Sequence, residues 1–109
     1  MSELTIDAGV CGFVTTVRAG SNDGGMTLVI EYGTTCPHVA KARPQIASVD
    51  PMVELFRKPH ETTVYAALSP HLPHAACPVC AGFLKAIEAA AGLALAKDVS
   101  MRFAPGGSS

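Results

Sequence analysis

A turn sequence near the N-terminus constrains the fold of this chain more than any other feature. Residues 21–25 read Ser-Asn-Asp-Gly-Gly, which are residue types that favour tight turns. Apolar and β-branched residues lie on both sides: Leu4 to Ile6 and Phe13 to Val17 precede the turn, and Met26 to Tyr32 follow it. The segment after the turn has the two-residue period of a half-buried strand. The sequence therefore predicts an N-terminal β-hairpin that ends at Gly33.

Helix signals follow the hairpin. Pro37 and Pro51 suit first helical positions, because a proline there loses no helical hydrogen bond. Gly92 suits the position just past the end of a long apolar helix. The predicted helices are Val39 to Arg43, which Pro44 ends or kinks, residues 51–57, and a final helix that begins at Cys77-Pro78 and runs to Gly92. Residues Glu61 to Leu68 are ambiguous, because residues 62–65 favour a strand and residues 66–68 favour a helix, and of the two we take the helix.

The C-terminal part returns to a strand-like pattern. From Val99 to Phe103, apolar residues alternate with polar ones, which predicts a strand that joins the hairpin sheet. Strands, then helices, then one closing strand predict an α+β fold: a small antiparallel sheet with helices packed on one face. A chain of 109 residues has room for one hydrophobic core, so we expect a single domain over residues 1–103 and a flexible tail at 104–109.

Composition excludes several classes of function. Apolar residues make up 49% of the chain, and eight basic residues nearly balance nine acidic ones, so we expect a globular protein that binds no nucleic acid. The most apolar stretch, Phe83 to Ala96, carries Lys85 and Glu88 and is shorter than the roughly 20 residues of a membrane-spanning helix. No secretory signal is recognisable at Met1 to Val10, so we expect a cytoplasmic protein with no membrane partner.

Four cysteines carry most of the chemical information. Cys11, Cys36, Cys77 and Cys80 are separated by 24, 40 and 2 residues, and each lies at a boundary between predicted elements. In a reducing compartment such cysteines are more often thiols or metal ligands than disulfides. The start of the first hairpin strand and the end of the second lie at the same end of an antiparallel sheet. We therefore expect Cys11 and Cys36 to be neighbours.

Local sequence around the cysteines favours ligation. Cys36 and Cys77 each precede a proline that opens a predicted helix, where unpaired amides and the helix dipole stabilise a thiolate. Cys80 follows three residues after Cys77, so the two sulfurs can share a helix face. Gly12 lets the backbone approach an inorganic centre and offer its amide to a sulfur. His74, three residues before Cys77, is the best additional ligand among the histidines.

This order of cysteines resembles that of the NifU/IscU-type iron-sulfur cluster assembly scaffolds. That family places a Cys-Gly before a strand, a second cysteine after the following strand, and a third that opens a long helix. The matching positions here are Cys11-Gly12, Cys36 and Cys77, over residues 11–92. The resemblance implies an IscU-like α+β fold, a cluster held by these cysteines, and partners among cluster-assembly or redox proteins.

The sequence also departs from the scaffold pattern. Phe13 stands where the scaffolds have an acidic residue, His74 is not adjacent to its cysteine, and the chaperone-recognition stretch reduces to Leu72-Pro73. With Cys80 as a fourth thiolate, the set suits a stably held cluster better than a transient one. Zinc is the alternative metal, although zinc sites usually recruit paired ligands from two turns. The alanine-rich final helix allows close packing, either in the core or between two copies.

Two further interpretations remain open at this stage. Cys77-Pro78-Val79-Cys80 at a helix start is also typical of a dithiol redox protein, in which the first thiolate attacks and the second resolves. Alternatively, any of the cysteines can be a small core residue, above all Cys80, which shares a helix stripe with Phe83 and Ile87. The sequence has no spaced pair of carboxylates near the cysteines and no phosphate-binding glycine loop, so nothing in it indicates catalysis of an organic reaction.

Overall fold

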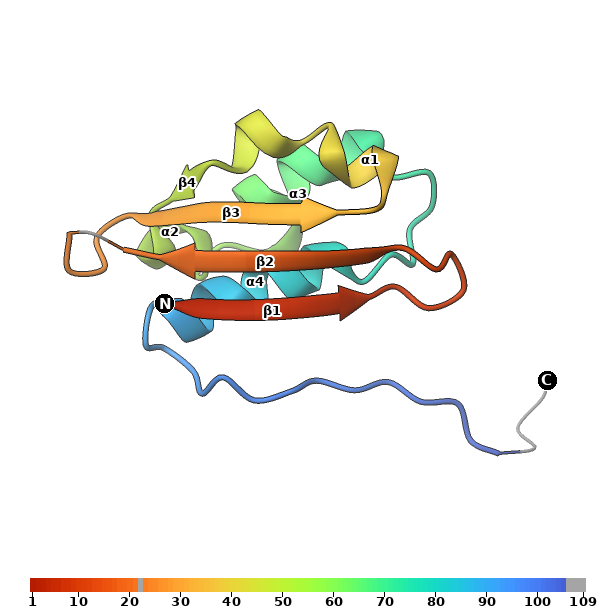
Figure 1. Ribbon diagram of the computed structural model, residues 1–109. Helices are drawn as coiled ribbons and strands as arrows, with labels where there is room; N and C mark the ends of the chain where they lie inside the picture. Colours follow the sequence, from red (N-terminus) through yellow and green to blue (C-terminus); the bar gives the residue numbers. More distant parts are fainter. Residues whose placement is uncertain (22, 106–109) are drawn as a thin grey trace.

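The computed structural model describes residues 1–21 and 23–105. Four strands form one antiparallel sheet in the order β1-β2-β3-β4 (Figure 1). The strands are β1 (Ser2–Asp7), β2 (Val14–Gly20), β3 (Leu28–Thr34) and β4 (Ser48–Val49). The predicted hairpin is confirmed as β2 and β3, and β1 pairs with β2 as a further edge strand. The chain therefore has the predicted α+β architecture.

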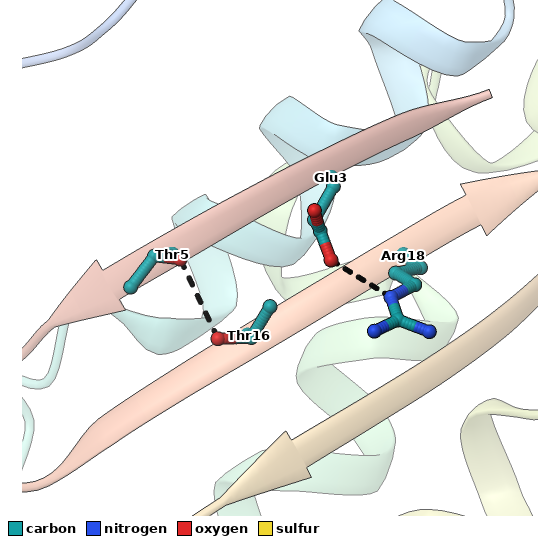
Figure 2. A network of polar contacts seen from close by, with 4 residues as sticks. All are labelled: Glu3, Thr5, Thr16 and Arg18. Atoms are coloured by element: carbon teal, nitrogen blue, oxygen red, sulfur yellow. Dashed lines mark hydrogen bonds and ion pairs between the residues drawn. The ribbon is translucent and has the colours of Figure 1, made fainter.

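The sheet buries one face and exposes the other. Every second residue of the strands lies in the core, including Ile6, Val17 and Ile30, because alternate side chains of a strand point to opposite faces. On the open face, Glu3 pairs with Arg18 at 2.8 Å, and the hydroxyls of Thr5 and Thr16 lie 3.4 Å apart (Figure 2). These polar pairs keep the open face hydrated, while the helices cover the apolar face.

The helical layer is built from short elements and one long helix. In chain order these are α1 (Pro37–Ala40), η1 (Arg43–Ile46), α2 (Pro51–Glu54), η2 (Pro59–Glu61), α3 (Thr63–Leu68), η3 (Ser69–His71) and α4 (Val79–Ala90). The predictions of helices at 61–68 and up to Gly92 are confirmed, and Gly92 has the positive φ of +75° expected just past a helix end. The helices predicted at 39–43 and 51–57 are shorter than expected, since each ends after about one turn.

A buried carboxylate fixes two of the short helices. Glu54 is 2% exposed, and its oxygens accept hydrogen bonds from the amides of Thr63 and Val64 at 2.9 and 2.8 Å. These are the free amides at the start of α3, where a negative charge is favourable. Thr62 adds a side-chain cap, because its hydroxyl accepts from the Tyr65 amide at 3.2 Å. The end of α2 is thereby tied to the start of α3.

The core lies between the sheet and α4. Phe83 is fully buried and meets the Tyr32 ring edge-on, with ring centroids 4.9 Å apart. The Tyr32 hydroxyl donates to the Val39 carbonyl at 2.9 Å, which links the sheet to α1. Burial raises the pKa of Tyr32 above its usual value, so this hydroxyl stays a donor.

The predicted closing strand at 99–103 is wrong. These residues form no strand, and Val99, Met101 and Phe103 are 62%, 83% and 96% exposed. The alternation fixes which side chains share a face, but it does not fix which neighbour supplies the backbone hydrogen bonds. The fourth strand is instead β4, which is too short to give a periodic signal and pairs with β3. Residues 106–109 of the predicted tail lie outside the described part of the chain.

No helix in residues 1–21 and 23–105 is long and apolar enough to cross a membrane.

Candidate functional site

One end of the sheet gathers the cysteine-bearing segments. The register pairs Thr15 of β2 with Thr34 of β3, so the start of β2 and the end of β3 are adjacent. Beyond them, the Val14 amide donates to the Thr35 hydroxyl at 2.9 Å, and the Thr35 amide donates to the Val14 carbonyl at 3.0 Å. The loop that carries Cys11 and the segment that carries Cys36 therefore leave the sheet at the same end, as the sequence predicts.

The start of α4 reaches the same end. Helix α4 runs antiparallel to β1: the Ser2 hydroxyl donates to the Ala86 carbonyl at 2.6 Å, and Gly82 lies against Ile6 near the end of β1. Figure 1 shows the loop between β1 and β2, helix α1 and the approach to α4 at this one end. We call this region the cysteine end: residues 8–13, 35–36 and 77–80. All four cysteines lie in it.

Cys36 is embedded in a cluster of threonine hydroxyls. It is 9% exposed, and its amide donates to the Thr34 hydroxyl at 3.1 Å. That hydroxyl lies 2.7 Å from the hydroxyl of Thr15, which is itself buried. Cys36 also precedes Pro37 at the start of α1, as predicted. Its backbone is held firmly, because two strands and one helix meet at it.

Cys11 lies in the exposed loop between β1 and β2. At the base of this loop, the Ala8 amide donates to the Phe13 carbonyl at 3.1 Å. Within the loop, the Gly12 amide donates to the Gly9 carbonyl at 2.9 Å. Gly9 and Gly12 adopt positive φ of +83° and +74°, which only glycine tolerates readily. The Gly12 amide is thus used within the loop and is not free to reach a sulfur. The Cys11 side chain faces solvent.

Cys77 and Cys80 flank the first turn of α4. Cys77 is partly exposed, whereas Cys80 is 2% exposed and shares the buried stripe of the helix with Phe83 and Ile87. Burial, and next the charge of a Cys77 thiolate, raise the pKa of Cys80 to about 11. Cys80 therefore stays a protonated thiol at neutral pH.

The ligands predicted from the sequence share this region without forming a closed set. Within the part of the chain that the structure describes, no three His, Cys, Asp or Glu side chains stand close enough to hold a metal ion. His74 lies in the turn before α4 and is exposed. The structure places Cys77 just before α4 and Cys80 within its first turn, it ties the Cys36 amide to the Thr34 hydroxyl, and it leaves the Cys11 side chain in solvent.

A hollow of about 580 Å³ lies elsewhere, beside β3 on the open face of the sheet. Its charged lining is already engaged: Arg18 pairs with Glu3, and Arg43 stacks over the Tyr32 ring at 5.0 Å from the centroid. Glu31 adds a single carboxylate. No cysteine or histidine is among the residues that line this hollow, so its lining offers no soft metal ligand.

Sequence reasoning missed the threonines that support the site. Thr15, Thr34 and Thr35 hold the strand ends around Cys36 through side-chain hydrogen bonds. Threonine is common in strands, and only the register shows that these hydroxyls meet. The Thr34-Thr35 pair directly before Cys36 is the one local signal that points to this role.

Comparison with known proteins identifies a family. Residues 2–103 match the family described as "Family of unknown function (DUF6951)". No curated protein and no solved structure matches the chain.

Proposed function

The chain belongs to the DUF6951 family, and from its own residues we propose that it binds an iron-sulfur cluster or a zinc ion through Cys11, Cys36 and Cys77. The fourth ligand is Cys80 or His74. The role is binding, with cluster-assembly or redox proteins of the cytoplasm as partners, rather than catalysis of an organic reaction.

The observation that carries this proposal is the convergence of three separate segments at the cysteine end. The loop 8–13, the end of β3 and the start of α4 are separate in sequence. The strand register and the packing of Gly82 on Ile6 nevertheless bring them to the same end of the sheet. Thiolates are the ligands that iron-sulfur clusters and structural zinc prefer. A convergence of thiols from independent segments is what such a centre requires.

Binding requires the Cys11 loop to move while the other two positions stay nearly fixed. The loop has two glycines at positive φ and an exposed tip, so it can change conformation without disturbing the core. Cys36 and Cys77 are held by the sheet and by α4. Phe13, which packs against the core at the base of the loop, shields the side of the site from water. These cysteines would hold the centre; an iron-sulfur cluster there would supply electron exchange, whereas zinc would supply only structural cross-linking.

Metal analysis and a visible spectrum of anaerobically purified protein test this function. We expect bound iron with inorganic sulfide, or zinc in aerobic preparations, at one centre per chain. Substitution of Cys11, Cys36 or Cys77 by alanine abolishes binding, because water must then fill a coordination position. A folded, colourless protein that holds neither iron nor zinc after anaerobic reconstitution contradicts the proposal. Circular dichroism checks that each variant is folded.

A second candidate function rests on the placement of Cys77 and Cys80 at the start of α4, with Cys77 partly exposed and Cys80 buried. In a thiol-disulfide exchange, the Cys77 thiolate attacks a disulfide of a partner and releases one partner thiolate. Cys80 then gives up its proton and attacks the Cys77 sulfur, which forms the Cys77–Cys80 disulfide and releases the second partner thiolate. Two electrons pass to the partner. The partly exposed Cys77 and the protonated, buried Cys80 match the attacking and resolving positions.

The Cys80→Ala variant separates the two functions. For a metal centre anchored by three cysteines, Cys80→Ala keeps most of the metal, whereas Cys11→Ala loses it. For a dithiol, Cys80→Ala eliminates reversible oxidation, while Cys11→Ala leaves the reduction potential of the remaining pair nearly unchanged. Metal content and disulfide-reductase activity, measured on both variants, distinguish the two patterns. Indifference of both assays to both variants contradicts both functions and leaves Cys36 and Cys80 as core residues.

A further inference from the structure

Within residues 1–21 and 23–105, the β1 edge of the sheet has no partner strand. In the order β1-β2-β3-β4, β1 is hydrogen-bonded only to β2, so its outer edge presents free backbone groups over Ser2–Asp7. Such an edge is a template for another strand unless it is blocked. Its inner face continues the core, because Ile6 is buried and Leu4 packs against the core while staying partly exposed at the edge.

A strand-like segment of the same chain also has no partner. Residues 93–103 follow α4 in an extended course (Figure 1). Between residues 94 and 105, all of them described, the single backbone hydrogen bond joins the Lys97 amide to the Leu95 carbonyl at 2.9 Å. The large apolar side chains of this segment, Leu95, Val99, Met101 and Phe103, are all more than 60% exposed. A run of exposed apolar residues of this kind marks an interaction site.

The segment passes beside β1 without pairing to it. Residues Leu95 to Val99 form one wall of a small cleft of about 70 Å³, whose other wall includes Ser2 to Leu4 and Ala86 of α4. The segment runs in the same direction as β1 (Figure 1). Pairing within one chain would therefore add a parallel strand to a sheet that is otherwise antiparallel, and parallel pairing is slightly weaker.

A second copy removes this conflict. A two-fold axis perpendicular to β1 reverses the direction of every strand in the partner, so the segment of one copy becomes antiparallel to β1 of the other. The side chains also fit. Val99, Met101 and Phe103 fall on one face and can extend the row of Leu4 and Ile6, while Ser100 and Arg102 fall on the open face with Glu3, Thr5 and Asp7.

We propose that two copies of this protein form a dimer by exchanging residues 95–103, each segment adding an antiparallel strand to the β1 edge of the partner. The segment lies within the part of the chain that matches its family. The exchange covers the exposed apolar residues and closes the open edge in one step. It is independent of the metal site, which lies at the ends of the strands rather than along the β1 edge.

Analytical ultracentrifugation of the full chain tests this dimer, with hydrogen-deuterium exchange as the second measurement. We expect a dimer in which the amides of 99–103 and of the β1 edge are protected. Phe103→Asp raises the dissociation constant at least about tenfold, because a buried aromatic anchor is lost. The control Phe56→Asp changes an aromatic residue that is 71% exposed outside the segment, and it leaves the dimer intact.

Three outcomes overturn the proposal. The first is a monomeric wild-type chain with an unprotected segment, and the second is a monomer with protected 99–103 amides, which shows pairing within one chain. The third is a dimer that responds equally to Phe103→Asp and Phe56→Asp, which places the interface elsewhere. Since Phe103 is 96% exposed and contributes nothing to the core, its substitution does not prevent folding.

Discussion

The two ends of the sheet are closed in different ways. At the turn end, side chains tie the connection between β2 and β3: the Asp23 carboxylate accepts from the Ser21 hydroxyl at 2.7 Å and from the Thr27 amide at 3.0 Å, and Gly25 donates to Ser21 at 2.8 Å. At the cysteine end, backbone hydrogen bonds close the base of the loop between β1 and β2, while its tip at Val10 and Cys11 is exposed.

This difference suggests different roles for the two connections: the one between β2 and β3 stabilises the hairpin, and the loop between β1 and β2 can change conformation. A turn whose polar groups are satisfied by its own side chains has one preferred conformation. A loop with exposed apolar and thiol side chains leaves its interaction surface uncovered, and local opening costs little. One end of the sheet is thus held by side-chain hydrogen bonds of Ser21 and Asp23, while at the other end Cys11 can approach the more firmly held Cys36 and Cys77.

Thiol alkylation gives the largest expected contrast within the cysteine end. Cys11 is exposed, whereas Cys80 is buried and has a pKa of about 11. At pH 8, this pKa makes the thiolate fraction of Cys80 roughly 100-fold lower than that of an ordinary free cysteine, and burial slows the reaction further. We expect iodoacetamide, followed by peptide mass spectrometry, to modify Cys11 first and Cys80 last. Equal rates at the two positions would show that α4 does not bury Cys80.

A substitution at Gly82 tests how the cysteine end is assembled. A Cβ at this position would lie 2.6 Å from Cγ1 of the buried Ile6, closer than real Cβ contacts. Gly82→Val therefore forces the start of α4 away from β1, and we expect the free energy of unfolding to fall by about 2 kcal/mol. Chemical denaturation measures this loss.

The control for Gly82 lies at the turn end. A Cβ at Gly20 meets Met1 at 3.5 Å, which is ordinary van der Waals contact. Gly20→Ala should therefore change the free energy of unfolding by no more than about 0.5 kcal/mol. If Gly82→Val is as mild as Gly20→Ala, α4 is not packed tightly on β1, and the convergence of the cysteine segments loses its main support.

The smallest expected effect concerns the turn end. Hydrogen bonds from the Thr27 amide, and then from Ser21, hold the pKa of Asp23 below its usual value. A lowered pKa contributes stability above the unfolded-state pKa of about 4, and that stability is lost as the pH falls through the folded-state pKa. Asp23→Ala should thus be slightly less stable than wild type at pH 7, and the difference should shrink in acid. A difference that grows in acid would contradict this assignment.

Local patterns predicted much of the fold. The turn chemistry at 21–25 located the hairpin, and the apolar stripe ending at Gly92 located α4. Strand β4 escaped prediction because it has two residues, and the helix predicted at 51–57 was too long because α2 ends after one turn. Glu54 illustrates a further limit, since its buried role depends on the amides of Thr63 and Val64, which only the tertiary structure brings near.

The candidate site was predictable at the level of topology. Antiparallel pairing alone indicates that the segments of Cys11 and Cys36 meet, and the register confirms it. The burial of Cys80 beside Phe83 agrees with the core alternative that its helical spacing offered, whereas the exposure of the Cys11 side chain depends on the loop conformation and was not predictable. The prediction of a closing strand at 99–103 was wrong for a related reason, since a periodic pattern does not specify the neighbouring strand with which the segment must pair.

The central claim is that sulfurs from three separate segments share one metal, and a cobalt titration tests it most directly. Co²⁺ occupies tetrahedral thiolate sites in place of zinc and gives a charge-transfer absorption that increases with the number of sulfur ligands. For anaerobic, reduced protein, we expect Cys11→Ser to lower this absorption per bound metal by about a quarter to a third and to weaken binding at least about tenfold, because one of three or four thiolates is lost. Identical spectra and affinities for wild type and Cys11→Ser would contradict the claim.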